Sequence, residues 1–186
     1  MFRTLLLAGL VILSASFAEA KTVSGVDFPD TLSENAADLQ LNGAGTRSKL
    51  FIKLYAAALY LQSPTADAGA ILAADEPMTL SLQIVSGLID SDKMEEAVVE
   101  GFDNATGGDT APLQERIDRF ISVLREEIKK EDAFVFSYRP ASGTHVSKNG
   151  EEKIVIEGLD FKTALFGIWL SDKPAQKSLK KDLLGR

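Results

Sequence analysis

Cysteine is absent from the 186 residues, and histidine occurs once, at His145. The lack of cysteine excludes disulfides, thiol nucleophiles and cysteine-based metal sites. A single histidine, in a chain without a G-x-S-x-G motif, argues strongly against a serine–histidine or cysteine–histidine catalyst. Because no other metal ligand stands at suitable spacing from His145, we predict neither a metal site nor a cofactor. We expect His145 to lie exposed or half-buried on a strand.

An apolar run long enough to cross a bilayer is also missing. The N-terminal run from Leu5 to Leu13 is far shorter than the roughly 20 residues of a membrane-spanning helix. Arg3 precedes this run and an Ala-x-Ala sequence ends at Ala20, which is the pattern of a cleaved export signal. We therefore predict a signal peptide at residues 1–20, a mature chain of residues 21–186, a periplasmic location and no membrane span. A lipoprotein anchor is excluded because it needs a cysteine.

Basic residues are fewer than acidic ones, 20 against 27, and the net charge is −7. An acidic surface disfavours nucleic acid and anionic lipid headgroups as general partners. It still permits a small anionic ligand, because one buried arginine can set the local field. The oligomeric state does not follow from composition.

Hydrophobic patterns predict strands in hairpin order and helices gathered in blocks. Strands are expected at residues 21–29, 39–41, 50–61, 78–85, 133–138, 145–148 and 153–156. Helices are expected at residues 65–74, 91–104, 112–128, 161–170 and 176–184. Gly43 and Gly45 indicate a tight turn or bulge, and Asn149-Gly150 indicates a hairpin. The order is typical of one α+β domain with a mainly antiparallel sheet.

Arg47 directly precedes the most apolar part of the mature chain, residues 50–61. A guanidinium keeps its charge and offers a planar fork of donors to carboxylates. The placement suggests a pocket for an apolar anion, although the spacing alone is more typical of the alternative. The alternative is an ordinary surface arginine after a glycine-rich turn. The preceding Gly-x-Gly pattern ends in Ser48 and leads into a strand, so it does not match a dinucleotide fingerprint.

Two blocks of sequence follow one another along the chain. The first is LNGAGTR at residues 41–47, with FIKLY at 51–55 and ALYL at 58–61. The second comprises NG at 149–150, IEGLDF at 156–161, ALFGIWLSDKP at 164–174 and LLG at 183–185. Together they resemble the chalcone isomerase-like family, in particular its bacterial exported branch, over essentially all of the mature chain. The resemblance implies a large antiparallel sheet backed by a layer of helices, with a ligand cleft between them.

The resemblance also implies two kinds of function. Plant enzymes of the family close a chalcone to a flavanone, whereas other members are non-enzymatic and bind fatty acids, with an arginine and a tyrosine holding the carboxylate. Arg47 matches the family arginine, and Tyr55 falls where the plant enzymes have a threonine. Their other polar cleft positions fall at Asp90, Ala97 and Ile168, and these replacements argue against flavanone chemistry.

The preferred hypothesis is therefore a non-catalytic binder of an apolar carboxylate such as a fatty acid, with Arg47 and Tyr55 as ligand-binding residues. The alternative is an isomerase, an intramolecular lyase of the chalcone isomerase type, that acts on an unknown substrate; its catalytic residues are unassigned. A third class is a structural or assembly factor with a filled cleft. Trp169 and Phe166 are expected to pack in the core.

The distance between Arg47 and Tyr55 tests this hypothesis. The two residues share one face of a regular strand, but eight residues of straight strand would separate them by roughly 26 Å. They can hold one ligand only if the chain turns back near Ser48-Lys49. Otherwise Tyr55 packs in the core with its hydroxyl satisfied elsewhere.

The predicted export signal has a direct test. N-terminal sequencing of the exported protein should begin at Lys21 or within a residue or two of it, because Ala20 ends the Ala-x-Ala site. Recovery of uncleaved chain in the membrane fraction would contradict both the signal peptide and the periplasmic location.

Overall fold

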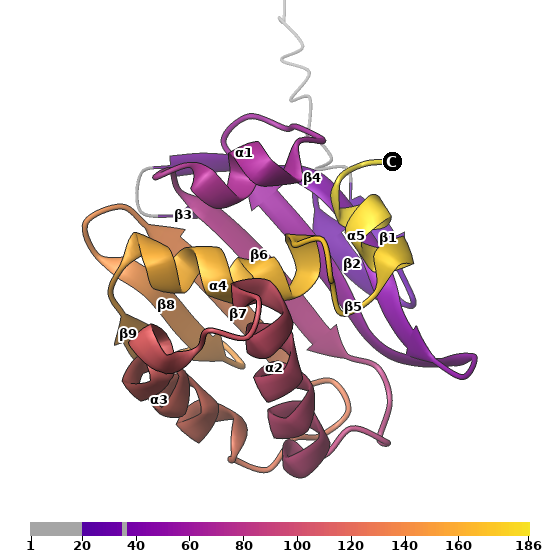
Figure 1. Ribbon diagram of the computed structural model, residues 1–186. Coiled ribbons are helices and arrows are strands. Elements are labelled where there is room, and N and C mark those ends of the chain that lie inside the picture. Colours follow the sequence, from indigo (N-terminus) through magenta and orange to yellow (C-terminus); the bar gives the residue numbers. More distant parts are fainter. Residues whose placement is uncertain (1–19, 35–36) are drawn as a thin grey trace, which may run out of the picture.

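The computed structural model describes residues 20–34 and 37–186 (Figure 1). Residues 1–19, which make up all but the last residue of the predicted signal peptide, lie outside the described residues. Ala20 is the first residue of strand β1 (Ala20–Val23). A mature chain that starts at Lys21 therefore keeps all but one residue of that strand.

Seven strands form one antiparallel sheet, in which each strand pairs with its neighbours along the chain. This meander confirms the expected α+β class with a large antiparallel sheet. The strands are β3 (Thr31–Glu34), β4 (Ala37–Lys49), β5 (Ile52–Leu61), β6 (Met78–Ile84), β7 (Ala133–Arg139), β8 (Gly143–Lys148) and β9 (Glu151–Ile156).

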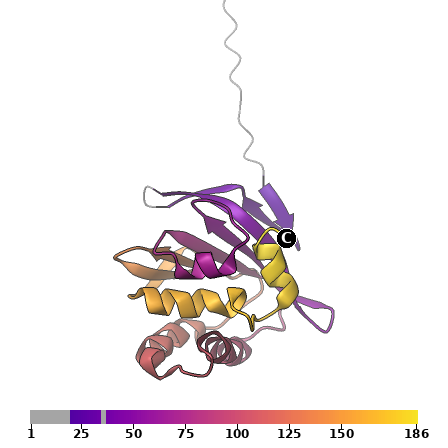
Figure 2. The same cartoon turned by 45° about the horizontal axis from the view of Figure 1, so that its top comes forward.

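A separate two-stranded ribbon, β1 paired with β2 (Val26–Pro29), lies against one face of this sheet (Figure 2). The prediction of a single strand at residues 21–29 is wrong. The chain reverses at Ser24 and Gly25, whose φ angles are 53° and 82°. Serine and glycine tolerate this left-handed region better than a branched apolar residue does, and the reversal brings Val26 and Phe28 onto the sheet.

The helices cover the opposite face of the sheet (Figure 2). They are α1 (Ala68–Ala73), α2 (Ser91–Thr106), α3 (Gln114–Leu124), α4 (Leu159–Leu170) and α5 (Lys177–Leu183), with a 3-10 turn at Ala111–Leu113 before α3. All five are helices that the sequence patterns predict, although the expected helix 112–128 is shorter and begins with the 3-10 turn. None of the helices in the described part of the chain is long and apolar enough to span a bilayer.

Helix α4 lies at the centre of the helical layer and contacts α1, α2 and α5. Its residues from Phe161 to Leu170 are buried apart from half-buried Thr163, which explains why the segment is apolar on all sides except at Lys162 and Thr163. Trp169 stacks on Phe136 of β7 at a ring-centroid distance of 5.8 Å. The expected core positions of Trp169 and Phe166 are confirmed.

From Tyr55 to Leu61, strand β5 is buried on both faces. Its odd-numbered residues, Tyr55, Ala57, Leu59 and Leu61, belong to the core beneath the helices. Its even-numbered residues, Ala56, Ala58 and Tyr60, face the β1–β2 ribbon. Burial of both faces accounts for the continuous apolar run, which lacks the alternation of a half-exposed strand.

An extra residue, Asn42, forms a β-bulge in β4. Leu41 pairs with Tyr60 and Gly43 pairs with Leu59, so Asn42 has no partner on β5. The bulge changes which residues face the helices, because side chains alternate along a strand. Before it, Leu39 and Leu41 face the ribbon; after it, the odd-numbered Gly43, Gly45 and Arg47 face the helices.

Gly43 and Gly45 lie inside β4 and do not form a tight turn; the other expected possibility, a bulge, is present directly before Gly43. A Cβ atom at either position would collide with Asp182 of α5, so the glycines allow the helix to approach the strand closely. The actual turn is at Leu50 and Phe51, which join β4 to β5 with positive φ angles. The expected strand at residues 50–61 therefore begins two residues later, at Ile52.

Lys162 joins α1 to α4. It is fully buried, and its ammonium donates hydrogen bonds to the carbonyl oxygens of Ile71, Leu72 and Ala74 at 2.6, 3.1 and 2.8 Å. Carbonyl groups at a helix C-terminus have no partner within the helix and favour a cation. Burial lowers the pKa of Lys162 to about 8, so the ammonium stays charged at neutral pH.

We predict that Lys162→Met lowers the free energy of unfolding by about 3 kcal/mol, because the carbonyl groups of Ile71 and Ala74 lose this donor in a mostly dry environment, whereas that of Leu72 keeps the Thr163 hydroxyl. Chemical denaturation measures the change. Lys180→Met is the matched control, since that half-buried ammonium donates to only one carbonyl group, that of Ser171. Equal destabilisation of the two variants would contradict the special role of Lys162.

Candidate functional site

A cavity of about 420 Å³ opens between the end of the β4–β5 hairpin, α2 and the segment after α4. This volume lies within the roughly 300–1,000 Å³ of small-molecule sites. Its walls are mostly apolar: Leu54, Leu82, Ile89, Met94, Ala97, Val98, Ile168, Trp169, Pro174 and Ala175. We call it the Arg47 cavity after the half-buried arginine in its wall.

Arg47 is held in place by the chain that follows α4. Its Nη1 donates a hydrogen bond to the carbonyl oxygen of Ala175. Next to it, the Ser48 N–H group donates to Oε1 of Gln176 at 2.8 Å. Within the described residues, no carboxylate forms an ion pair with Arg47. A guanidinium has five N–H donors, so most of them remain available to an anion in the cavity.

Tyr55 lies directly opposite Arg47 on the neighbouring strand, and both residues line the Arg47 cavity. The chain turns back at Leu50-Phe51, close to the position that a shared site requires, so the roughly 26 Å of a straight strand does not separate them. The buried Tyr55 hydroxyl accepts a hydrogen bond from Nε1 of Trp169 at 3.0 Å. It donates to no other group in the described part of the chain.

Burial raises the pKa of Tyr55, although the hydrogen bond from Trp169 and the charge of Arg47 both act in the opposite direction. The phenol therefore keeps its proton at neutral pH. Because the Trp169 N–H group occupies one acceptor position, the hydroxyl proton points elsewhere and can be donated to a ligand atom. Arg47 and Tyr55 thus place a fixed cation and a neutral donor side by side.

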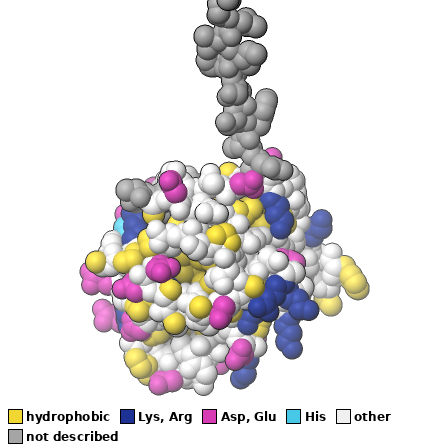
Figure 3. Space-filling model, turned by 90° about the horizontal axis from the view of Figure 1, so that it is seen from above, with side chains coloured by type: hydrophobic (Ala, Val, Ile, Leu, Met, Phe, Trp, Pro, Cys, Tyr) yellow, Lys and Arg dark blue, Asp and Glu magenta, His cyan; other side chains and the backbone are white. Residues whose placement is uncertain are grey.

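The cavity rim has charges of both signs, in keeping with the mixed surface in Figure 3. Lys49 is exposed beside Arg47, and Glu96 and Glu100 are exposed on α2. Lys93 is exposed as well and pairs with Asp90 at 2.5 Å. Exposed charges are screened by solvent. Arg47 is therefore the charged lining residue with the strongest influence on the cavity interior.

Three positions that the resemblance links to the polar cleft of the plant enzymes have different roles here. Asp90 is exposed and caps α2, where its side chain accepts a hydrogen bond from the Lys93 N–H group. Ala97 and Ile168 line the cavity but offer no polar atom. Sequence reasoning missed Asn104, a half-buried residue of α2 that supplies a polar group to the wall.

His145 is half-buried on β8, as expected, but it has three polar partners that the sequence analysis did not anticipate, one of them Nη1 of Arg139 at 3.3 Å from its Nδ1. Its Nε2 lies 2.6 Å from Oγ of Ser142, and its Nδ1 lies 2.8 Å from Oε2 of Glu152. This order is that of a serine–histidine–acid relay. Ser142 is exposed in the β7–β8 turn, however, and none of the three residues lines the Arg47 cavity. We interpret these contacts as fastening the ends of β7, β8 and β9.

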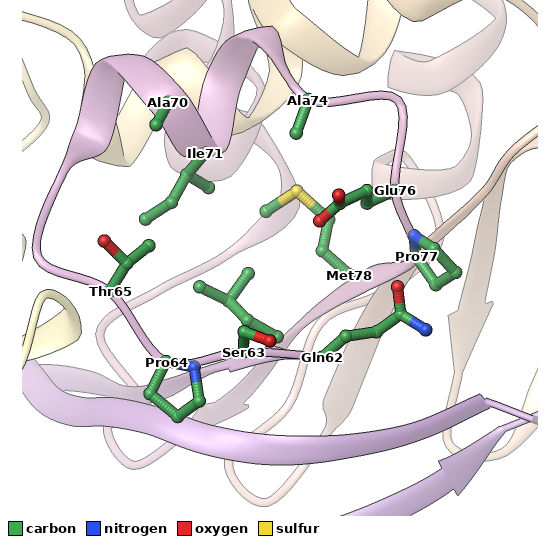
Figure 4. Close-up of a pocket in the computed structure, with 11 residues that line it drawn as sticks. Gln62, Ser63, Pro64, Thr65, Ala70, Ile71, Ala74, Glu76, Pro77 and Met78 are labelled. Atoms are coloured by element: carbon green, nitrogen blue, oxygen red, sulfur yellow. The ribbon is translucent and has the colours of Figure 1, made fainter.

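A second cavity, of about 300 Å³, lies beside α1 (Figure 4). Ile71 and Met78 point toward its centre, and the chain at residues 62–65 forms one side. Glu76, which is exposed, is its charged lining residue. This cavity thus offers no cation to an anionic ligand. The described residues also contain no group of three or more histidine, aspartate or glutamate residues arranged to hold a metal ion.

The profile of the chalcone isomerase-like family matches residues 20–185. The chain belongs to this family. Comparison with curated proteins finds no match. Among solved structures, a fatty-acid binding protein of Arabidopsis thaliana is similar, with a TM-score of 0.69 and 20% sequence identity. The alignment covers 89% of this chain and 96% of the plant chain, so the chalcone isomerase-like fold extends over nearly the whole domain.

We predict a common response of the tyrosines of this chalcone isomerase-like protein to alkaline pH. The chain has three tyrosines, and burial raises the pKa of each: Tyr55, Tyr60, and Tyr138, which reaches about 12. The unfolded chain loses these protons near pH 10. The contribution of the buried tyrosines to the free energy of unfolding is therefore fully present below pH 10, and it decreases as the pH rises further.

The test follows the ultraviolet absorbance of phenolate and the circular dichroism in one pH titration. Phenolate should appear together with unfolding, well above pH 10. Tyr55→Phe is the control and should remove one of the three final phenolate signals. Ionisation of all three tyrosines near pH 10 with intact circular dichroism would contradict the buried state of these side chains.

Proposed function

We propose that this protein is a non-catalytic binder of an apolar carboxylate such as a fatty acid. The observation on which this rests is the half-buried Arg47, which has no carboxylate partner among the described residues and lies opposite Tyr55 in an apolar cavity. The guanidinium and the tyrosine hydroxyl hold the ligand carboxylate by charge-assisted hydrogen bonds. The acyl chain lies along the apolar wall formed by α2 and α4.

Two further observations support this proposal. The similar plant structure is a fatty-acid binding protein, although at 20% identity the likeness itself concerns the fold. The predicted signal peptide favours the bacterial exported branch of the family and a periplasmic location. In that compartment, such a protein would shield a poorly soluble anion from water.

The alternative function is an isomerase of the chalcone isomerase type with an unknown substrate. Catalysis of this kind needs polar groups that stabilise charge in the transition state. Of the cleft positions considered, Arg47 and Tyr55 are polar and lie in the cavity, whereas Ala97 and Ile168 are apolar and Asp90 caps a helix. This arrangement favours binding over catalysis.

We predict that Arg47→Ala weakens the binding of palmitic acid about tenfold to a hundredfold, because a hydrogen bond to a charged group contributes about 1.5–3 kcal/mol. Arg47→Lys should recover only part of the affinity, since an ammonium lacks the planar fork. Hexadecanol, which has no charge, should bind the wild type and Arg47→Ala about equally. The sole tryptophan, Trp169, lines the cavity, so its fluorescence can report the titrations.

Arg119→Ala is the matched control, because this exposed guanidinium also donates to a backbone carbonyl group, that of Val155. It should bind palmitic acid like the wild type. Melting curves of the ligand-free proteins should show little loss of stability for Arg47→Ala. If Arg47→Ala binds palmitic acid as tightly as the wild type, or does not fold, Arg47 is structural and the proposed function fails.

We also predict that the protein does not cyclise a hydroxylated chalcone above the spontaneous rate, because Asp90, Ala97 and Ile168 do not supply polar groups to the cavity. Absorbance of the chalcone over time measures the reaction. Heat-denatured protein is the control for the spontaneous rate. Turnover that disappears in Arg47→Ala would show that the isomerase alternative is correct.

A further inference from the structure

The largest exposed apolar side chains gather at the rim of the Arg47 cavity. Six large apolar residues are exposed in the described part of the chain, and four of them lie here: Phe51 at 103%, Leu50 at 83%, Leu88 at 55% and Ile52 at 43%. Leu50, Ile52 and Leu88 line the cavity, and Phe51 projects fully into solvent beside them. We call Leu50, Phe51 and Ile52 the apolar tip.

The backbone conformation of the apolar tip does not account for the presence of apolar residues there. Leu50 and Phe51 form a two-residue hairpin turn with φ angles of 49° and 69°. Turns of this kind favour Asn-Gly, because asparagine and glycine adopt left-handed φ angles at little cost. Two bulky apolar residues strain the turn and expose a hydrophobic surface. Such local strain is typical of functional positions, so we infer that the two side chains serve a purpose outside the fold.

Exposed lysines accompany the apolar tip on the hairpin side of the rim, whereas Glu96 and Glu100 lie on its α2 side. Lys49 and Lys53 flank it along the hairpin, and both are exposed. Exposed Lys177 follows Gln176, whose side chain holds the neighbouring Ser48. Figure 3 shows the dark blue side chains gathered on the side of the molecule with α5 and the hairpin, beside a projecting yellow group. The chain as a whole has a net charge of −7, so a group of lysines contrasts with the average charge of the molecule.

We propose that the apolar tip docks the protein on the surface of an anionic phospholipid bilayer. This inference rests on the proposed function, because it names the place where the cavity receives or releases its ligand. Phe51 and Leu50 enter the boundary between headgroups and acyl chains, while Lys49, Lys53 and Lys177 contact the phosphate groups. The rim of the Arg47 cavity then lies at the membrane, and an acyl chain passes between bilayer and cavity with little exposure to water.

Flotation with vesicles tests this inference, using the protein without its predicted signal peptide. The wild type should bind vesicles of phosphatidylcholine with phosphatidylglycerol, bind phosphatidylcholine alone weakly, and dissociate in high salt. Phe51→Gly should bind about tenfold more weakly, because a large buried aromatic surface is lost. Its melting temperature should equal or exceed that of the wild type, because glycine suits the φ angle of 69°.

The second variant, Lys53→Glu with Lys177→Glu, should also bind at least about tenfold more weakly. Leu159→Ser is the control, because Leu159 is exposed at the start of α4 and is not among the cavity-lining residues. It should bind like the wild type. If the wild type binds neutral and anionic vesicles equally, ignores both, or binds no more tightly than Phe51→Gly, the inference is wrong.

Palmitic acid titrations of the same proteins separate this inference from the proposed function. Phe51 does not line the cavity, so Phe51→Gly should keep the wild-type affinity for palmitic acid in solution. Docking without palmitic acid binding would overturn the proposed function while supporting the membrane surface. Palmitic acid binding without docking would support the proposed function and overturn the inference.

Discussion

The position of Arg47 depends on one extra residue in β4. Without the bulge at Asn42, the alternation of side chains would turn Arg47 toward the β1–β2 ribbon and away from Tyr55. Asn42 also fastens the surroundings of the bulge: its Nδ2 donates to the Leu183 carbonyl group, and its Oδ1 accepts from the Thr65 N–H group, both at 2.7 Å. Asn42 therefore determines which face of the sheet Arg47 is on, and it also anchors α5, the helix that follows the wall residues Pro174 and Ala175 in the chain.

The element types follow from the sequence because apolar periodicity reports which face is buried. All five helices and most strands are predictable in this way. The prediction errors occur where one local sequence pattern can arise from two different structures. Gly43 and Gly45 are typical of a turn or a bulge, but here they lie in a strand next to a bulge, and glycine is needed because Asp182 leaves no room for a Cβ atom. Leu50 and Phe51 resemble a strand because apolar residues seldom occupy left-handed turns.

The candidate site is only partly accessible from the sequence. The resemblance identifies Arg47 and Tyr55, but their proximity depends on the β4–β5 pairing and on a turn with unusual residues. The hydrogen bond from Trp169 to Tyr55 joins residues far apart in the chain, so no local pattern indicates it. Net charge has a similar limit: it averages over the whole surface, whereas the fold brings particular lysines, Lys49 and Lys53, next to the apolar tip.

The contact between Arg47 and Ala175 has a consequence for how the protein assembles. A sheet whose strands pair in chain order can form progressively as the chain is synthesised, because each strand needs only the one before it. The cavity wall at Pro174 and Ala175, and the carbonyl group that orients Arg47, come from the last part of the chain. The sheet can therefore form before the Arg47 cavity does. The protein can bind a ligand only after the segment with Pro174 and Ala175 has packed against the sheet.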